Sequence, residues 1–478
     1  MSASSEATDA RGLCREPAVE IRRRLLAREV SAVEMVEAHL EVIERCNPQV
    51  NAIVTLLAEP ALQSARDADR ALARGAPLGP LHGLVVAHKE STETAGIRTT
   101  FGSPLFADHV PDRDALIVER MRAAGAITIG KTNIPEWATG SNCVNPVYGA
   151  TRNPYDTRLT PGGSSGGAAV ALTCGMVALA DGSDIGGSLR IPASFCNVVG
   201  LRPSPGRVPS WPSGLPWSTL AVHGPMGRTV ADVALMLSAV AGADDRSPIS
   251  LTDDPARFAA PLEREFGGVR VAWSPTLGGL PIEPAVTAAL EPGRAVLCGL
   301  GCEVRGMEPD LCGAELAFTT WRAWGFDAEL GELLDRSPEL IGANVRWNIE
   351  LGRTLSGRDL ARAELARGEL YQRMREFMSE HEFLVAPVVQ VPPFPIEIDH
   401  PLQVAGEAME TYIDWMRSCW LISATGLPAI SVPCGFTDDG LPVGLQIVGR
   451  HRDELGVLQL AHAFEAATQQ WRRAPAIV

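Results

Sequence analysis

The sequence predicts an α/β fold: a single large α/β/α layered domain with a central mixed β-sheet and a mostly helical lid insertion. Short apolar runs alternate with amphipathic helical segments, which is typical of helices packed on a sheet. Forty-six of the 478 residues are glycine, and seven of them stand in two serine motifs between residues 161 and 192. Over residues 312–380 the short apolar runs that indicate strands stop, and the apolar residues recur at helical spacing. This change of pattern predicts the lid.

The first 75 residues are expected to form a helical segment that packs on the core. Ser31 and Glu34 have the spacing of a capping box, and apolar residues at helical intervals follow them. A second helix is expected over residues 60–74, because Gly75 ends the helical pattern there.

The core is expected over residues 76–250 and again over 381–478, on either side of a variable, mostly helical lid or substrate region at 251–380. The expected strands of the core and lid cover residues 81–88, 126–129, 269–273, 382–389, 430–433 and 444–448. The expected helices cover residues 114–124, 168–180, 229–241, 284–300 and 454–469.

Composition limits the kinds of partner that the chain can have. The formal net charge of −15 argues against a nucleic acid or an anionic membrane as the main partner. No apolar run is long enough for a membrane span, and the polar amino terminus does not resemble a signal peptide. The ten cysteines include no C-x-x-C pair, so we expect reduced thiols in a cytoplasmic protein.

The chain contains two glycine-flanked serine motifs that lie close together in the sequence. The first reads P-G-G-S-S-G-G over residues 161–167, and the second reads G-S-D-I-G-G-S-L-R-I-P over residues 182–192. Their serines Ser164 and Ser188 are 24 positions apart. Dense glycine marks close backbone approach or positive φ, and free N–H groups in such turns can bind a developing oxyanion. The pair of motifs therefore predicts a catalytic centre.

A phosphate-binding loop is one alternative, because G-A-I-T-I-G-K-T over residues 125–132 fits the Walker A pattern. The pattern requires a strand before the first glycine and a helix after the threonine. Here a helix precedes, the intervening residues look like a strand, and Pro135 follows, so the phosphate interpretation is disfavoured.

A nucleophile elbow around Ser164 is the other alternative, because G-G-S-S-G over residues 162–166 fits its pattern. An elbow needs an apolar strand directly before it. The preceding residues 153–161 instead read as a loop with two prolines, and no downstream histidine has an obvious acidic partner. The elbow interpretation is therefore also disfavoured.

Lys89, Ser164 and Ser188 together favour a different chemistry. Singly, a lysine after a buried strand usually forms an ion pair, and a serine in a glycine-rich turn is usually a turn residue. Together, however, they provide a nucleophile and a base, since burial can lower the pKa of a lysine toward neutrality. A second serine can carry the proton between the two groups.

Long segments resemble the amidase signature family of serine hydrolases. They are P-L-H-G-L-V-V-A-H-K-E over residues 80–90, G-K-T-N-I-P-E-W-A over 130–138, the run 161–209, and G-L-P-A-I-S-V-P-C-G over 426–435. The resemblance covers the core on both sides of the lid, while residues 250–380 carry little of it. The match at residues 130–138 also replaces the Walker interpretation.

The resemblance implies roles for individual residues. Lys89 corresponds to the catalytic lysine, Ser164 to a bridging serine on a cis peptide bond, and Ser188 to the nucleophile. The family's oxyanion hole corresponds to Ile185, Gly186, Gly187 and Ser188, and its supporting positions to Asp184, Arg190, Ser165 and Gly163. The family implies no metal and no organic cofactor.

The expected substrate is a small amide or carbamate, cleaved by the chain alone, as a monomer or homodimer. Val144, Trp321, Trp324 and Trp347 suggest an apolar pocket, although the tryptophans could equally pack the lid. A glutaminase subunit of a tRNA-dependent amidotransferase remains an alternative, but no charged pair that would hold glutamine is evident in the lid. A non-catalytic family member is disfavoured, because the lysine and both serines are present.

Overall fold

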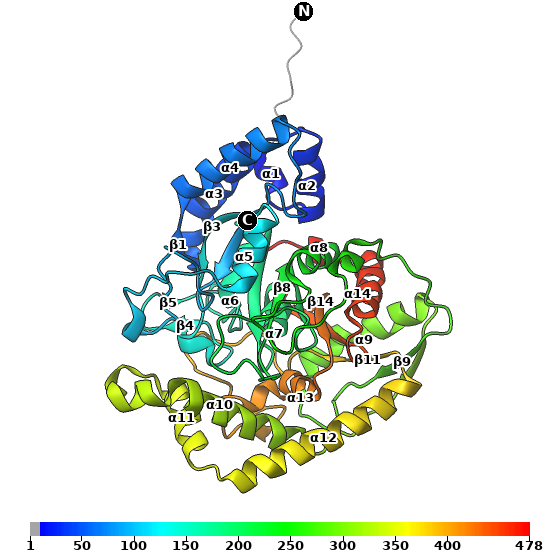
Figure 1. The fold of residues 1–478 in the computed structure, drawn as a ribbon. Coiled ribbons are helices and arrows are strands. Elements are labelled where there is room, and N and C mark those ends of the chain that lie inside the picture. Colours follow the sequence, from blue (N-terminus) through cyan, green and yellow to red (C-terminus); the bar gives the residue numbers. More distant parts are fainter. Residues whose placement is uncertain (1–9) are drawn as a thin grey trace, which may run out of the picture.

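The computed structural model describes residues 10–478, and one mixed sheet of eleven strands runs through it (Figure 1). The strand order is β1 (Ile53–Leu56), β3 (Ile127–Thr132), β2 (Val85–Lys89), β6 (Leu179–Asp184), β8 (Val222–Gly227), β7 (Val199–Arg202), β14 (Ala429–Phe436), β15 (Pro442–Val448), β11 (Phe383–Pro387), β9 (Arg270–Trp273) and β10 (Glu303–Gly306). β2 is parallel to both β3 and β6, whereas β14 is antiparallel to both β7 and β15. The predicted mixed sheet is therefore confirmed.

The amino-terminal segment contains α1 (Ala10–Leu13), α2 (Ala18–Leu26), α3 (Ala32–Val50) and α4 (Ala58–Ala73). The capping box of α3 is present: the Glu34 backbone N–H donates to Ser31 Oγ at 3.1 Å, and the Ser31 N–H donates to the Glu34 carboxylate at 2.8 Å. The segment also contains β1, which was not predicted and which pairs with β3 at the edge of the sheet.

Helices cover both faces of the sheet. On one side, α8 (Val230–Val240), α9 (Pro284–Gly299) and α14 (Glu454–Thr468) contact the strands. The other side carries α6 (Gly166–Thr173) and α7 (Arg190–Cys196), which contact the strands and each other. The remaining core helix is α5 (Leu116–Ala123), which packs on α8. The layered α/β/α class is thus confirmed.

The apolar run between the two serine motifs is shorter as a helix than predicted. A helix was expected over residues 168–180, but α6 ends at Thr173 and β6 begins at Leu179. Gly175 has φ +73°, the left-handed conformation that commonly follows the last turn of a helix. The run therefore supplies a helix, a turn and the start of a core strand.

The predicted helical lid consists of α10 (Ala314–Arg336), α11 (Ala343–Arg353) and α12 (Gly357–Glu380). These three helices lie together along the lower edge of the molecule in Figure 1, where α10 and α12 contact α13 (Arg417–Thr425). The lid has a small apolar cluster of its own, made by Phe326, Leu330, Leu334, Ile341, Val345 and Ile349. Earlier in the 251–380 region, β9 and β10 instead extend the central sheet.

Within residues 10–478, no helix is both long and apolar enough to cross a bilayer.

Candidate active site

Lys89 is the last residue of β2, and its side chain is completely buried. Its Nζ atom lies 2.7 Å from Ser164 Oγ and 2.9 Å from Ser183 Oγ, both hydrogen-bond distances. The structure thus brings together two of the predicted residues from separate segments. Ser183 was not singled out from the sequence, although it stands in the second serine motif, directly before Asp184.

Burial changes the charge preference of this lysine. Desolvation lowers the pKa of Lys89 from 10.5 to about 7, even though the carboxylates of Asp181 and Asp184 act in the opposite direction. A substantial fraction of the amine is therefore neutral near pH 7. A neutral amine has a lone pair and can accept a proton from a neighbouring hydroxyl group.

Asp181 holds the end of β2 in place from the neighbouring strand β6. Its buried carboxylate lies 2.7 Å from His88 Nδ1, accepts a hydrogen bond from Thr92 Oγ1 at 2.9 Å, and accepts one from the Lys89 backbone N–H at 3.4 Å. The far side of the His88 ring lies 3.0 Å from Thr128 Oγ1. These contacts fix the backbone from which the Lys89 side chain extends.

The first serine motif forms a tight buried loop before α6. Its Gly163–Ser164 peptide bond is cis, as the family resemblance implied. Gly163 lies against Ser141: a Cβ added to this glycine would lie 3.3 Å from the Ser141 backbone. The Ser165 backbone N–H donates to the Ser188 carbonyl oxygen at 3.2 Å. This bond ties the two serine loops together.

The second serine motif forms the loop between β6 and α7. Gly187 has φ +118°, and its backbone N–H donates to Asp184 Oδ1 at 2.9 Å. That amide is therefore occupied by a side chain within the loop. The amides of Ile185, Gly186 and Ser188 have no hydrogen-bond partner among residues 10–478, so of the four predicted oxyanion-hole residues these three have a free donor.

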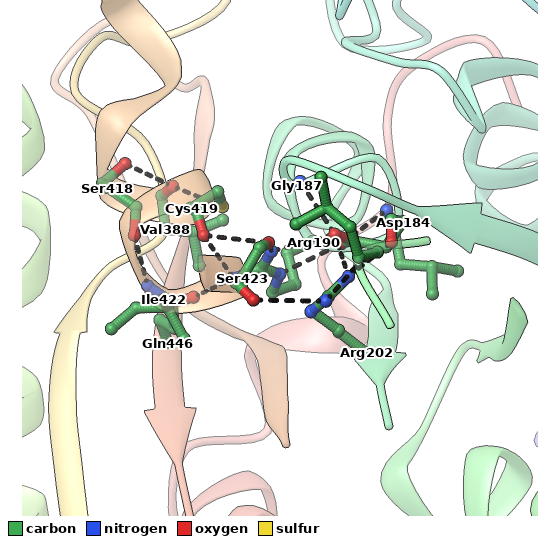
Figure 2. Close-up of polar contacts among 12 residues, drawn as sticks. Asp184, Gly187, Arg190, Arg202, Val388, Ser418, Cys419, Ile422, Ser423 and Gln446 are labelled. Atoms are coloured by element: carbon green, nitrogen blue, oxygen red, sulfur yellow. Dashed lines mark hydrogen bonds and ion pairs between the residues drawn. The ribbon is translucent and has the colours of Figure 1, made fainter. Parts of the chain in front are cut away.

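A buried ion cluster supports this loop (Figure 2). Arg190 donates to the Asp184 carboxylate through Nε at 3.1 Å and through Nη2 at 2.9 Å, and Arg202 Nη1 lies 3.2 Å from the same carboxylate. Arg190 also donates to Gln446 Oε1 at 2.6 Å and to Ser423 Oγ at 2.7 Å. Burial opposes ionisation of Asp184, but the two guanidinium charges outweigh it and hold the pKa of that carboxyl well below its usual range.

The predicted pocket residues lie on two lid helices and one hairpin. Trp321 and Trp324 of α10 pack edge to face with ring centroids 5.3 Å apart, and Trp347 of α11 packs on Tyr412 at 5.6 Å. Val144 belongs to β4 (Val144–Asn145), which pairs with β5 (Gly149–Ala150), and its side chain is exposed. Their role in binding substrate stays a prediction.

Sequence reasoning missed the side chains that contact the second serine loop directly. A Cβ added at Gly186 would lie 3.0 Å from Phe318 Cζ and 3.3 Å from Trp420 Cβ. These two rings stack on each other with centroids 4.9 Å apart. A Cβ at Gly187 would lie 2.6 Å from Cys419 Cβ. Phe318 is one helical turn before Trp321, but no local signal distinguishes it from an ordinary core residue.

The described residues contain no cluster of three side chains suited to hold a metal ion, and all ten cysteines are free thiols. A cavity of about 560 Å³ opens between α12 and the loop at residues 248–253. None of its lining residues belongs to the two serine loops, so this cavity is separate from the candidate site.

The site places a buried lysine within hydrogen-bond distance of a serine hydroxyl group, as a base and a hydroxyl group of a hydrolase would lie, and comparison with known proteins identifies the family. The family model described as Amidase matches residues 34–458. The chain therefore belongs to the amidase family, whose enzymes carry the amidase signature.

Relatives align along nearly the whole chain. An acylamidase from Rhodococcus erythropolis is 36% identical over 96% of this chain and 97% of its own length. The A-type subunit of the glutamyl-tRNA(Gln) amidotransferase from Synechococcus sp. (strain CC9605) is 34% identical over 95% and 96%. The structure of a bacterial aryl acylamidase of the amidase signature family has a TM-score of 0.89 and 27% identity, covering 96% of this chain and 98% of the other.

Proposed function

We propose that this protein is a stand-alone serine amidohydrolase that cleaves the C–N bond of small amides through an acyl-enzyme on Ser188. The observation that carries the proposal is the buried contact between Lys89 and Ser164, with the pKa of the lysine lowered to about 7. Serine is a weak nucleophile unless a neighbouring base removes its proton. Lys89 is the base that the geometry offers.

The proposed reaction begins with proton transfer. Neutral Lys89 accepts a proton from Ser164, which accepts one from Ser188 as the Ser188 oxygen attacks the amide carbonyl. The proton then returns through Ser164 to the leaving nitrogen, because an amine departs readily only when it is protonated. Water attacks the acyl-enzyme by the same relay and releases the carboxylic acid.

Negative charge that builds on the carbonyl oxygen needs donors fixed in advance. The free amides of Ile185, Gly186 and Ser188 are the candidates, while the Gly187 amide holds the loop through Asp184. Loss of one such donor typically slows catalysis by about a hundredfold or more. The Asp184–Arg190 cluster acts in this scheme by keeping the loop in shape.

Aryl and alkyl amides are the proposed substrate class, with carbamates and esters as compounds that share the same carbonyl chemistry. Two observations support the class: relatives named acylamidase and aryl acylamidase align over nearly the whole chain, and Phe318 and Trp420 place aromatic surface against Gly186. We propose that the chain acts on them without a partner subunit, nucleic acid or cofactor, as a monomer or homodimer in the cytoplasm.

A glutaminase subunit of an amidotransferase is the second candidate. It is favoured by the relatives of that name, which also match along nearly the whole chain at 34% identity. A non-catalytic family member is a weaker alternative, since the chain retains Lys89, Ser164 and Ser188.

The test is to incubate the purified chain alone with a nitroanilide, an aryl carbamate or glutamine, and to follow aniline and ammonia release. We expect turnover of the anilide or the carbamate, and none by the Ser188→Ala variant. Turnover of glutamine alone, or activity only after a partner is added, would assign the chain to the amidotransferase class. No turnover of any compound would favour the non-catalytic alternative.

A further inference from the structure

Arg322 of α10 is a buried cation in the lid without an acidic partner. Its side chain is 8% exposed, and no carboxylate of residues 10–478 lies within ion-pair distance of it. Three other buried arginines are paired: Arg190 and Arg202 share Asp184, and Arg207 pairs with Glu454. Arg228 is also buried without an ion pair among the described residues, but it donates to the backbone carbonyl oxygens of Glu16, Leu172 and Val177. Because a buried charge is costly when it is poorly compensated, and Arg322 has neither a carboxylate nor a backbone carbonyl of these residues as a partner, its position requires an explanation.

The contacts of Arg322 are with neutral groups only. Its Nη1 donates to Asn348 Oδ1 on α11, and its Nη2 donates to the Tyr412 hydroxyl oxygen. The guanidinium also lies over the rings of Phe326, at 4.7 Å, and Tyr412, at 5.5 Å. A guanidinium has five N–H donors, and these two bonds leave most of them available.

Tyr412 adds a second available donor beside the guanidinium. Its hydroxyl oxygen accepts hydrogen bonds from Arg322 Nη2 and from Asn348 Nδ2, the latter at 2.6 Å. Two accepted bonds occupy both lone pairs of the oxygen, so the hydroxyl hydrogen must point elsewhere. No acceptor for that hydrogen is present in the described part of the chain.

The Arg322–Tyr412 pair is linked to both serine loops through neighbouring residues. Along α10, Arg322 is one turn, about 5.4 Å, beyond Phe318, the ring that contacts Gly186. On the other side, the Tyr412 ring lies 3.6 Å from the position of a Cβ at Gly140. The next residue after Gly140 is Ser141, which contacts Gly163. The two donors are thus close to the point where substrate must bind.

We propose that Arg322 and Tyr412 bind a carboxylate group that the substrate carries at a distance from its scissile amide. This inference rests on the proposed function and narrows its substrate class to amides with a free carboxylate. A carboxylate accepts two hydrogen bonds from adjacent donors and supplies the charge that the buried guanidinium lacks. The surrounding rings of Phe326 and Trp347 exclude water and strengthen the contact.

Matched substrates test this inference. We compare the nitroanilide of a monocarboxylic acid with the half-nitroanilide of the dicarboxylic acid of the same chain length. A second pair carries the carboxylate on the aniline ring instead. We expect the enzyme to have the lower KM for the carboxylate-bearing member of at least one pair. Equal kcat/KM values within both pairs would overturn the inference.

Substitutions then test whether Arg322 and Tyr412 are the residues that cause the preference for a carboxylate-bearing substrate. We expect Arg322→Gln to lower kcat/KM for the preferred carboxylate substrate by about 10- to 100-fold, through KM, with only small changes for the neutral one. Tyr412→Phe keeps the ring and should cause a smaller loss of the same kind. Arg336→Gln, at the exposed end of the same helix, is the matched control and should change neither substrate. Equal losses on both substrates, through kcat, would assign Arg322 a purely structural role.

A binding measurement separates this inference from the proposed function. Calorimetry with glutarate is performed on Ser188→Ala and on the double variant that also carries Arg322→Gln. Binding that weakens at least tenfold in the double variant supports the carboxylate site, even if the parent enzyme hydrolyses no anilide. Turnover of neutral anilides, without a carboxylate preference and without glutarate binding, would overturn the carboxylate site and leave the proposed function standing.

Discussion

The Nζ atom of Lys89 lies 2.7 Å from the hydroxyl oxygen of Ser164, and neither side chain is accessible to water. The pair joins the end of strand β2 to the loop that begins helix α6. Because burial penalises the ammonium form, the contact depends on pH in a range where an ordinary lysine does not titrate.

The rate of hydrolysis should therefore follow the titration of Lys89. The lysine must be neutral to accept a proton, and its pKa is lowered to about 7. We expect kcat/KM to rise about tenfold per pH unit below pH 7 and to level off above it. A pH–rate profile on a nitroanilide measures this directly. A value of kcat/KM that keeps rising with pH toward the ordinary lysine pKa of 10.5 would contradict the role of Lys89 as a base with a lowered pKa.

The stability of the folded protein should also depend on the titration of Lys89. In the unfolded chain Lys89 titrates near 10.5, and in the folded protein near 7, so between these values the unfolded state binds more protons. The free energy of unfolding of the natural protein should rise with pH over that window, by up to about 1.4 kcal/mol per unit from this group. Lys89→Met removes this contribution. Urea unfolding at pH 7 and pH 9 measures the free energy of unfolding of both proteins. The stability of Lys89→Met relative to the natural protein should be lower at pH 9 than at pH 7. A difference that does not change with pH would argue against the lowered pKa of Lys89.

The two serines should differ in how strongly their removal affects turnover. Ser188→Ala deletes the proposed nucleophile and should abolish activity. Ser164→Ala deletes only the proton relay, so a small residual rate is expected, at least about a hundredfold below the natural one. Single-turnover assays measure both, and near-ultraviolet circular dichroism verifies that each variant is folded. Full activity in either variant would exclude the proposed relay.

Gly187 should not tolerate a side chain. At its φ of +118° an added Cβ would lie 2.6 Å from Cys419 Cβ and 2.7 Å from Ile191 Cδ1, so the loop would have to move. We expect Gly187→Ala to lose at least about a hundredfold in kcat, because the neighbouring amides would leave their positions. Gly368→Ala on α12 is the control. It meets no atom within 4 Å and should stabilise its helix by up to ~1 kcal/mol without changing the rate.

Much of the core could be predicted from local pattern. Strands such as β2 and β11 appear as short buried apolar runs, and the Ser31 capping box marks the start of α3. Lys89, Ser164 and the loop of Ser188 were expected together because their motifs are long. β1 escaped prediction because only four residues form it and its partner β3 is distant in sequence.

Contacts that depend on tertiary structure could not be predicted. Phe318 and Trp420 reach Gly186 from helices that lie more than a hundred residues further along the chain. The sequence also does not indicate that Asp184 would occupy the Gly187 amide, since four consecutive residues in a glycine-rich turn look like equivalent donors. Only the folded backbone distinguishes a donor that faces substrate from one that holds the loop.

Asp184 should be essential for stability as well as for the loop. Its carboxylate is the counter-charge for two fully buried guanidiniums, those of Arg190 and Arg202. Asp184→Asn keeps the size of the side chain but leaves both charges uncompensated, which should cost about 3–5 kcal/mol of unfolding free energy. Urea denaturation measures this loss.

Asp253→Asn is the matched control for that substitution. Asp253 also pairs with a buried arginine, Arg207, but its side chain is 44% exposed and Arg207 keeps a second partner in Glu454. We therefore expect this change to cost at most about 1 kcal/mol. Since the Gly187 amide depends on Asp184 alone, the Asp184→Asn variant should also lose activity under conditions in which it remains folded. Equal effects of the two substitutions would mean that the buried cluster contributes no more than a surface ion pair.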